Sequence, residues 1–344
     1  MTTTVTVKVG ATNSPVTMDY TSFLTAVDAC PADLTSVDQI WIANLYNQGT
    51  LTISSAITWA VVTDVNRYVT VQAAPGASFY ENGTGALRYN NSNGVALEGS
   101  PSGFLVRSQI NNLNLSRVQV RATGGSASAA WFFDSTTGNT FSDFLKIDQC
   151  IFSGVVGGSN HTVACITGSN GYMQNCLVII ENINSNSGGI YNVASIVYDN
   201  CTVCLPSDLS GSGMHGISGY GSVIVQNTAI FGFASAFVGT VNAASKNIVT
   251  DAATITSSPP NSVTSVPYTT STFVNPSSSG GVANSGGSVD YRLVSGSAPI
   301  GAGTTTGAPT YDILNRSRVG VANDVGSYQF NLPVATTPMF VNIL

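Results

Sequence analysis

Short apolar runs alternate along most of the chain with clusters of Gly, Ser and Asn. One stretch carries such runs at Cys150–Val155, Val163–Ile166 and Tyr172–Met173, with Gly- and Asn-containing clusters between them. Apolar runs of this length are typical of β-strands, and the intervening clusters are typical of turns. The pattern therefore predicts about three short strands in each stretch of roughly 25 residues.

A repeat sets the period of this pattern. Four similar hexapeptides follow one another: Ile147–Phe152, Met173–Val178, Tyr198–Val203 and Val225–Ile230. Their third residues are spaced 26, 25 and 27 positions apart, and we expect a fifth copy at Ile110–Leu115. Three strands in a turn of this length indicate a parallel β-helix whose coils stack about 4.8 Å apart. We predict an all-β chain that forms a single right-handed parallel β-helix (solenoid), with a short N-terminal capping helix and an irregular C-terminal cap.

Equivalent residues of successive coils should form columns. The third position suits a bend with left-handed backbone geometry, where stacked amides can pair as a ladder; its residues are Gln149, Asn175, Asn200 and Asn227. The next column is small and is expected to point inward as buried thiols; its residues are Cys150, Cys176, Cys201 and Thr228. Period-two alternation places a further column inside as well: Phe152, Val178, Val203 and Ile230.

The two ends of the chain differ from this repeat. A helix is expected from Ser22 to Ala29, with Phe23, Leu24 and Val27 on one face, and further strands at 39–42, 50–53, 68–72 and 290–293. We divide the chain into residues 1–80 (N-terminal cap and first coils), 81–256 (the repeating coils) and 257–344 (a closing segment with an apolar tail).

Composition narrows the function. Of 344 residues, only 11 are Lys or Arg and 17 are Asp or Glu, which is 8% charged and a net charge of −6. A charged fraction of roughly 25% is usual, and the many small polar residues disfavour a helical protein. The acidic balance argues against nucleic acid as a partner, and no apolar run is long enough to span a membrane. We expect folding in a cytoplasm, with the six cysteines as thiols.

Catalysis by paired carboxylates is the first alternative. Asp148 and Asp199 share a column with Gln174 and Gln226, so two coils, about 9.6 Å, separate the acids. That distance is near the range of inverting glycosidases. The column alternates with inward apolar residues, so we expect a solvated ladder in which like charges are not adjacent.

Other chemical sites have little support in the sequence. The Arg residues are scattered and Lys is rare, which disfavours a lyase. Cys201-x-x-Cys204 has a spacing seen in metal and redox sites, but no second pair accompanies it. His161 and His215 are expected at turns. We therefore predict no metal and no cofactor.

Apolar residues suggest contacts with other chains. Trp41 and Trp59 are expected in the core, whereas the aromatic triplet is the best candidate for an exposed patch; it consists of Trp131, Phe132 and Phe133. The uncharged C-terminus predicts either a packed last strand or an arm that docks on a neighbouring subunit; its large apolar residues are Met339, Phe340, Ile343 and Leu344.

The C-terminal part resembles a known family. The strings Asp290–Leu293, Ser295–Ile300 and Asp324–Tyr328 are similar to the closing signature of right-handed parallel β-helix repeat proteins. In the front half, Asp38–Ala43 and Tyr68–Phe79 resemble β-helical structural proteins of tailed bacteriophages. The resemblance implies a virion protein of the decoration or head-fibre type and no catalytic residues.

These observations favour a non-enzymatic bacteriophage structural protein. It would be assembled in the host cytoplasm, form a homotrimer, and dock on the major capsid protein or other virion proteins. The alternative is a tail spike or fibre that binds or cleaves a host surface polysaccharide.

Overall fold

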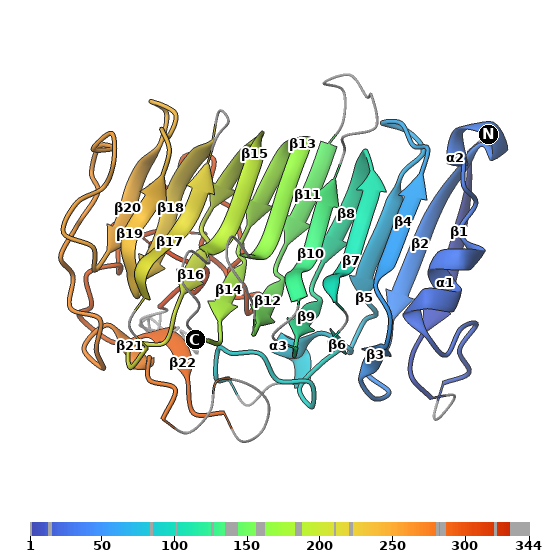
Figure 1. Cartoon of the computed structure of the whole chain (residues 1–344), viewed down its shortest axis with the longest axis horizontal. Coiled ribbons are helices and arrows are strands. Elements are labelled where there is room, and N and C mark those ends of the chain that lie inside the picture. Colours follow the sequence, from blue (N-terminus) through green and yellow to red (C-terminus); the bar gives the residue numbers. More distant parts are fainter. Residues whose placement is uncertain are drawn as a thin grey trace, which may run out of the picture.

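The computed structural model describes residues 2–12, 16–82, 85–100, 102–124, 127–134, 144–155, 162–182, 188–209, 211–219, 223–279, 282, 287–319 and 322–330. The chain winds as a right-handed parallel β-helix, and its coils follow one another along the long axis from β1 to β20 (Figure 1). The predicted fold class is confirmed. None of the described helices has the length and apolar character needed to cross a bilayer.

Three parallel stacks of strands form the walls, and long strands bend so that they contribute to two of them. Stack A contains β1 (Thr3–Val9), β2 (Gln39–Leu45), β5 (Val69–Ala73), β8 (Asn112–Ser116), β11 (Phe144–Asp148) and parts of β13 (Thr162–Gln174), β15 (Gly188–Asp199) and β18 (Ile224–Phe231). Stack B contains β3 (Leu51–Ile53), β6 (Ala96–Gly99), β9 (Gln119–Ala122), β12 (Ile151–Gly154), β14 (Leu177–Ile180), β16 (Thr202–Cys204), the end of β18 and β20 (Lys246–Thr250). Stack C contains β4 (Ile57–Val61), β7 (Gly103–Ile110), β10 (Ala127–Asp134), the first halves of β13 and β15, β17 (Gly211–Gly219) and β19 (Phe233–Val238).

The corner between stacks A and B has left-handed backbone geometry in successive coils. Its residues have φ between 49° and 61°: Arg117, Gln149, Asn175, Asn200, Asn227 and Asn247. Asn tolerates this region better than most residues because its short amide forms local hydrogen bonds. The predicted bend is therefore confirmed at four positions, and Asn247 extends it. The expected copy at Ile110–Leu115 is wrong, because Ser116 pairs with Asp148 and so aligns Arg117 with Gln149.

Inside the corner, the predicted cysteine column is confirmed. Cys150, Cys176 and Cys201 are fully buried free thiols in the main core. Burial raises the pKa of the Cys176 thiol well above its ordinary value, as expected for a thiol held in an apolar interior. The column of Phe152, Val178, Val203 and Ile230 lies in the same core.

The N-terminal end is closed by helices. In α1 (Phe23–Ala29), Ser22 accepts a hydrogen bond from the backbone N–H of Thr25, as an N-cap residue does. Phe23 and Val27 are buried as predicted, but Leu24 is exposed because Ala26 takes the third inward place. Two further short helices were not foreseen: α2 (Leu34–Val37) and α3 (Phe79–Asn82).

The described residues between 266 and 330, here called the C-terminal segment, are largely irregular and pack against the outer face of stack B. It contains an antiparallel pair formed by β21 (Phe273–Asn275) and β22 (Asp290–Leu293), which lie beside the β-helix (Figure 1). A second apolar cluster joins it to the outward side chains of stack B. Corner amides fasten it: Gln149 donates to the carbonyl of Asp312 at 2.7 Å, and Asn200 donates to that of Asp324 at 2.8 Å.

We expect Asn227→Ala to lower the free energy of unfolding by about 3–5 kcal/mol. The buried Asn227 amide bonds Asp199, Asn247 and Thr304, and alanine both removes these bonds and disfavours the positive φ. Asn227→Gly loses the same hydrogen bonds, but glycine adopts the positive φ without strain. In urea unfolding it should therefore lower the free energy of unfolding less than alanine does. If both variants lost the same free energy of unfolding, the tolerance of asparagine for the left-handed bend would not contribute to stability.

Candidate functional site

The two acids proposed as a catalytic pair lie in the predicted column on the outer side of stack A. Asp148 and Asp199 are each one coil away from Gln174. Asp199 accepts hydrogen bonds from Gln226 at 2.9 Å and from Asn227 at 3.0 Å. Asp148 accepts one from the Asn175 amide at 3.0 Å. Each carboxylate is thus engaged by amides of the following coil.

The prediction that this column is solvated is wrong for Asp199. Only 4% of Asp199 is exposed, because the amide of Asn227 turns back over it and the C-terminal segment packs on the same corner. Burial raises the pKa of both Asp148 and Asp199, and the amide hydrogen bonds lower it in part. The buried Asp199 has a structural place, holding neighbouring corners together, rather than a position open to substrate.

The aromatic triplet is not the exposed patch that we expected. Strand β10 alternates its faces, so Trp131 and Phe133 point into the core and are 0% and 2% exposed. Their rings stack at 5.5 Å, and the Trp131 indole N–H donates to Ser108 at 3.0 Å. Phe132 alone points outward, where it packs on Phe104. Trp41 and Trp59 are core residues, as predicted.

The remaining candidates do not form a site. Cys201 lies in the main core and Cys204 in the outer cluster, so their thiols do not converge. His215 is half-buried on β17, where burial lowers its pKa. His161 and the tail residues Met339, Phe340, Ile343 and Leu344 lie outside the described residues. Within the described part of the chain, no three His, Cys, Asp or Glu side chains gather as metal ligands would.

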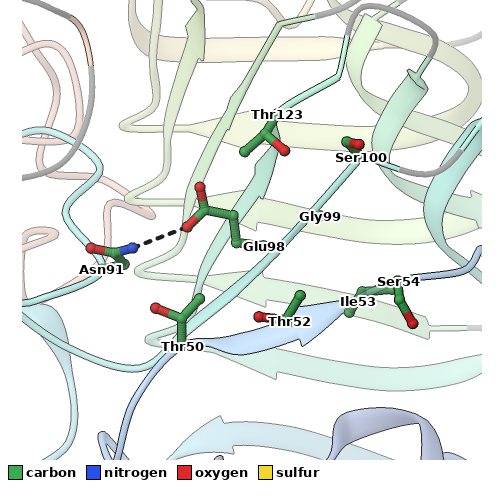
Figure 2. A pocket seen from close by; sticks show the side chains of 9 residues that line it. All are labelled: Thr50, Thr52, Ile53, Ser54, Asn91, Glu98, Gly99, Ser100 and Thr123. Carbon is green, nitrogen blue, oxygen red and sulfur yellow. Dashed lines mark hydrogen bonds between the residues drawn. The ribbon is translucent and has the colours of Figure 1, made fainter.

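A polar pocket of about 490 Å³, here called the Glu98 pocket, opens on the outer face of stack B. Figure 2 shows its lining residues, which come from β3 and β6, from positions next to these strands, from the loop before β6 and from the position after β9. They are Thr50, Thr52, Ile53, Ser54, Asn91, Glu98, Gly99, Ser100 and Thr123. Hydroxyl groups make up most of the polar lining, and Glu98 is the one charged residue in this set.

The register of stack B explains where the pocket ends. One outward row runs Thr52, Glu98, Arg121 and Ser153, and then continues as Ile179, Cys204 and Phe231. The apolar half of the row is buried beneath the C-terminal segment. In the polar half Thr52 is exposed and Glu98 and Arg121 are partly exposed, whereas Ser153 is buried. The accessible part of the row is therefore its first three residues.

Glu98 is held firmly in the pocket. Its Oε1 accepts a hydrogen bond from Arg121 at 2.9 Å, and its Oε2 accepts bonds from Asn91 at 3.0 Å and Tyr89 at 3.2 Å. Gly99 follows it because a Cβ there would lie 2.1 Å from the carbonyl oxygen of Ile53. Glycine therefore permits β3 and β6 to approach at the pocket floor.

A second glutamate completes the charge arrangement behind Glu98. Arg121 donates from Nε and Nη2 to Glu181 at 2.8 and 2.7 Å, a bidentate ion pair. Desolvation lowers the pKa of Arg121, but the hydrogen bonds and charges of Glu181 and Glu98 outweigh it, so the pKa is raised. Arg121 therefore remains a cation and is unsuited to act as a base. The three side chains form a rigid array with one excess negative charge.

Sequence reasoning missed this array. It treated the Arg residues as scattered, yet Arg121 brings together two of the three glutamates of the chain. Glu98 and Glu181 are 83 positions apart, and the 22 residues that connect β5 to β6 lengthen that coil and interrupt the period before Glu98. The signal available was the scarcity of glutamate, together with the alternating Ala-Leu-Glu-Gly and Gln-Val-Arg-Ala strands.

Comparisons with known proteins give one likeness to report. No family model and no curated protein matches the chain. Among solved structures it is similar to the crystal structure of pectate lyase Pel9A, with a TM-score of 0.42, 15% identity and 96% of each chain covered. This likeness concerns the fold. The comparisons do not support the expected phage origin, and the homotrimer and the capsid partner stay predictions.

The buried carboxylate of Asp199 predicts a pH-dependent contribution to stability. Because its folded-state pKa is raised above the ordinary 3.8, this contribution is fully present below the unfolded pKa and is lost as pH rises through the folded pKa. Asp199→Asn lacks this titration. We expect the stability of wild type relative to this variant to fall as pH rises from about 4, as measured by urea unfolding across pH 3–7. A difference that does not change with pH would contradict the assignment.

Proposed function

We propose that this chain binds an uncharged segment of a polysaccharide in the Glu98 pocket, without cleaving it. The observation that supports this most directly is the lining of the pocket. Hydroxyl side chains, an amide and a fixed carboxylate surround one open cavity of about 490 Å³. Sugar hydroxyls are both donors and acceptors, so they pair with each of these groups.

Rigidity of the site strengthens the proposal. Glu98 is positioned by Arg121, Tyr89 and Asn91, so its acceptor geometry exists before a ligand arrives. The loop that carries Asn91 is itself held, because Asn90 and Gln119 exchange two hydrogen bonds at 2.8 and 2.9 Å. A preformed site of this kind spares the ligand the cost of ordering the protein.

Charge determines which sugars are favoured. Arg121 is neutralised by Glu181 behind the pocket, and Glu98 contributes a negative charge to the lining. A carboxylated sugar would meet a like charge there, whereas a neutral sugar would donate a hydroxyl to Glu98. The pocket therefore favours neutral units.

Binding without cleavage also follows from the partners of Glu98. Hydrolysis of a glycosidic bond needs two carboxyl groups that face the substrate, one of them able to give up a proton. Both oxygens of Glu98 already accept hydrogen bonds, and Glu181, whose side chain is 4% exposed, is paired with Arg121. In a virion this activity belongs to a tail spike or fibre that attaches to a host polysaccharide, rather than to a capsid decoration protein.

The test is titration of the full chain against a panel of neutral oligosaccharides, followed by calorimetry. We expect Thr52→Val to weaken binding of the best ligand about 3–10-fold, since one hydrogen bond contributes about 0.5–1.5 kcal/mol. Thr58→Val is the matched control, because Thr58 is an equally exposed outward threonine on β4, away from the pocket. Its affinity should equal that of wild type.

Glu98→Gln provides the second arm, with Asp28→Asn on the exposed side of α1 as its control. Glu98→Gln should weaken the neutral ligand about tenfold, because a charged acceptor is the stronger partner. The proposal would be refuted if wild type bound no oligosaccharide of the panel, or if Thr52→Val and Thr58→Val bound the best ligand equally well. If wild type released reducing ends from the oligosaccharides and Glu98→Gln did not, the chain would be a glycosidase and not a binding protein.

A further inference from the structure

A second surface with different chemistry lies on the outer face of stack A. The C-terminal segment covers the later coils of stack B, whereas around β8 and β11 the outer face of stack A carries exposed side chains. A shallow pocket of about 170 Å³ opens there. Its lining, here called the stack A patch, consists of Val65, Tyr68, Asn112, Asn114, Phe144 and Lys146.

Aromatic rings give this patch a flat apolar surface. Phe144 is 41% exposed on a strand whose inward neighbour, Leu145, is buried. The adjacent Tyr172 meets Phe144 edge to face, with ring centroids 5.7 Å apart, and so fixes its orientation. Val65, 74% exposed, forms part of the rim. An exposed, braced aromatic ring is suited to contact the apolar face of a ring-shaped ligand.

A cation stands beside these rings. The Lys146 ammonium lies 5.3 Å from the centre of the Phe144 ring, and the side chain is exposed. In the described part of the chain no carboxylate lies within ion-pair distance of it, in contrast to Arg67, Arg107, Arg121, Arg292 and Arg316. Lys8 and Lys246 likewise show no ion pair among the described residues, so Lys146 is distinguished by its position beside the exposed ring of Phe144.

Asparagine amides supply directional groups on the strand beside the ring and the lysine. Asn114 aligns with Lys146 across neighbouring strands, as Asn112 aligns with Phe144. Asn114 donates to Thr70 at 3.3 Å, which holds its side chain in the row. Ring, amides and ammonium therefore lie within two adjacent strands, about 4.8 Å apart.

We propose that the stack A patch is a second ligand site and that it takes a sugar bearing a carboxylate. The sugar ring stacks on Phe144, its hydroxyls bond the asparagine amides, and its carboxylate pairs with Lys146. The site is separate from the Glu98 pocket and has the opposite charge preference, so it stands or falls independently of the neutral-sugar proposal.

A matched pair of ligands tests this site on the full chain. The probes are a short oligomer of glucuronate and its methyl ester, which differ in charge and share their rings. We expect wild type to bind the acid about tenfold more tightly than the ester at low salt, with the difference shrinking as salt is raised. Lys146→Gln should reduce binding of the acid to the level of the ester and leave the ester unchanged.

Two further variants separate stacking from charge. Phe144→Ala should weaken both probes about 5–10-fold, whereas Phe144→Tyr should retain binding. Lys8→Gln is the control for loss of a positive charge, because Lys8 is exposed on β1 at the N-terminal end of the rod.

The following results would overturn the proposal. One is equal binding of acid and ester by wild type, and another is an unchanged affinity in Lys146→Gln. A third is sedimentation showing that Phe144→Ala dissociates an oligomer while neither probe binds wild type, which would make the patch a contact between copies of the chain. Thr52→Val, which alters only the Glu98 pocket, should leave both probes unaffected.

Discussion

The left-handed bend between stacks A and B is the constraint on which the other features depend. A backbone with φ near 50° lets each coil turn sharply, and the same geometry in successive coils keeps the strands on either side in register. Register then decides which side chains point inward, because a shift of one residue exchanges the faces of a strand. The buried thiols and the divided outer row of stack B both follow from it. The corner amides also bind the C-terminal segment, so one repeated residue organises the interior and the cover.

Much of the repeating part could be predicted from the sequence. Asparagine at a fixed spacing is a physical marker, since few other residues accept a positive φ and pair through their side chains. The prediction is wrong where the corner residue is not Asn or Gln. In the coil before Gln149 this residue is Arg117, whereas the Asn-rich string at Ile110–Leu115 resembles the repeat without occupying the corner. A run of three aromatic residues predicts a surface patch, but alternation along β10 places two of the three in the core.

The candidate site was beyond the reach of the repeat pattern. Glu98, Arg121 and Glu181 meet because three coils place them on one face, and an insertion before β6 obscures the first of these coils in the sequence. The environment of Asp199 was misjudged for a related reason. Its column is outward, as expected, but outward is not the same as solvated when a distant part of the chain returns to cover it. The period of the sequence shows whether a side chain points inward or outward. Whether an outward side chain is buried depends on contacts with segments outside the repeat.

The return of the C-terminal segment limits how this protein can change its length. A solenoid normally gains or loses whole coils with little penalty, because each coil contacts only its neighbours. Here the segment is fastened at Gln149 by Asp312 and at Asn200 by Asp324, two coils further along the axis. The two anchors, Asp312 and Asp324, are therefore held at a fixed separation along the axis. Duplication or deletion of a coil between these anchors would leave the segment too short or too long to reach both. A further anchor, where Asp290 and Tyr291 bond the backbone of Leu87, extends this restriction to the coils that follow β5. Variation in length among related chains should accordingly accumulate at the N-terminal end of the rod.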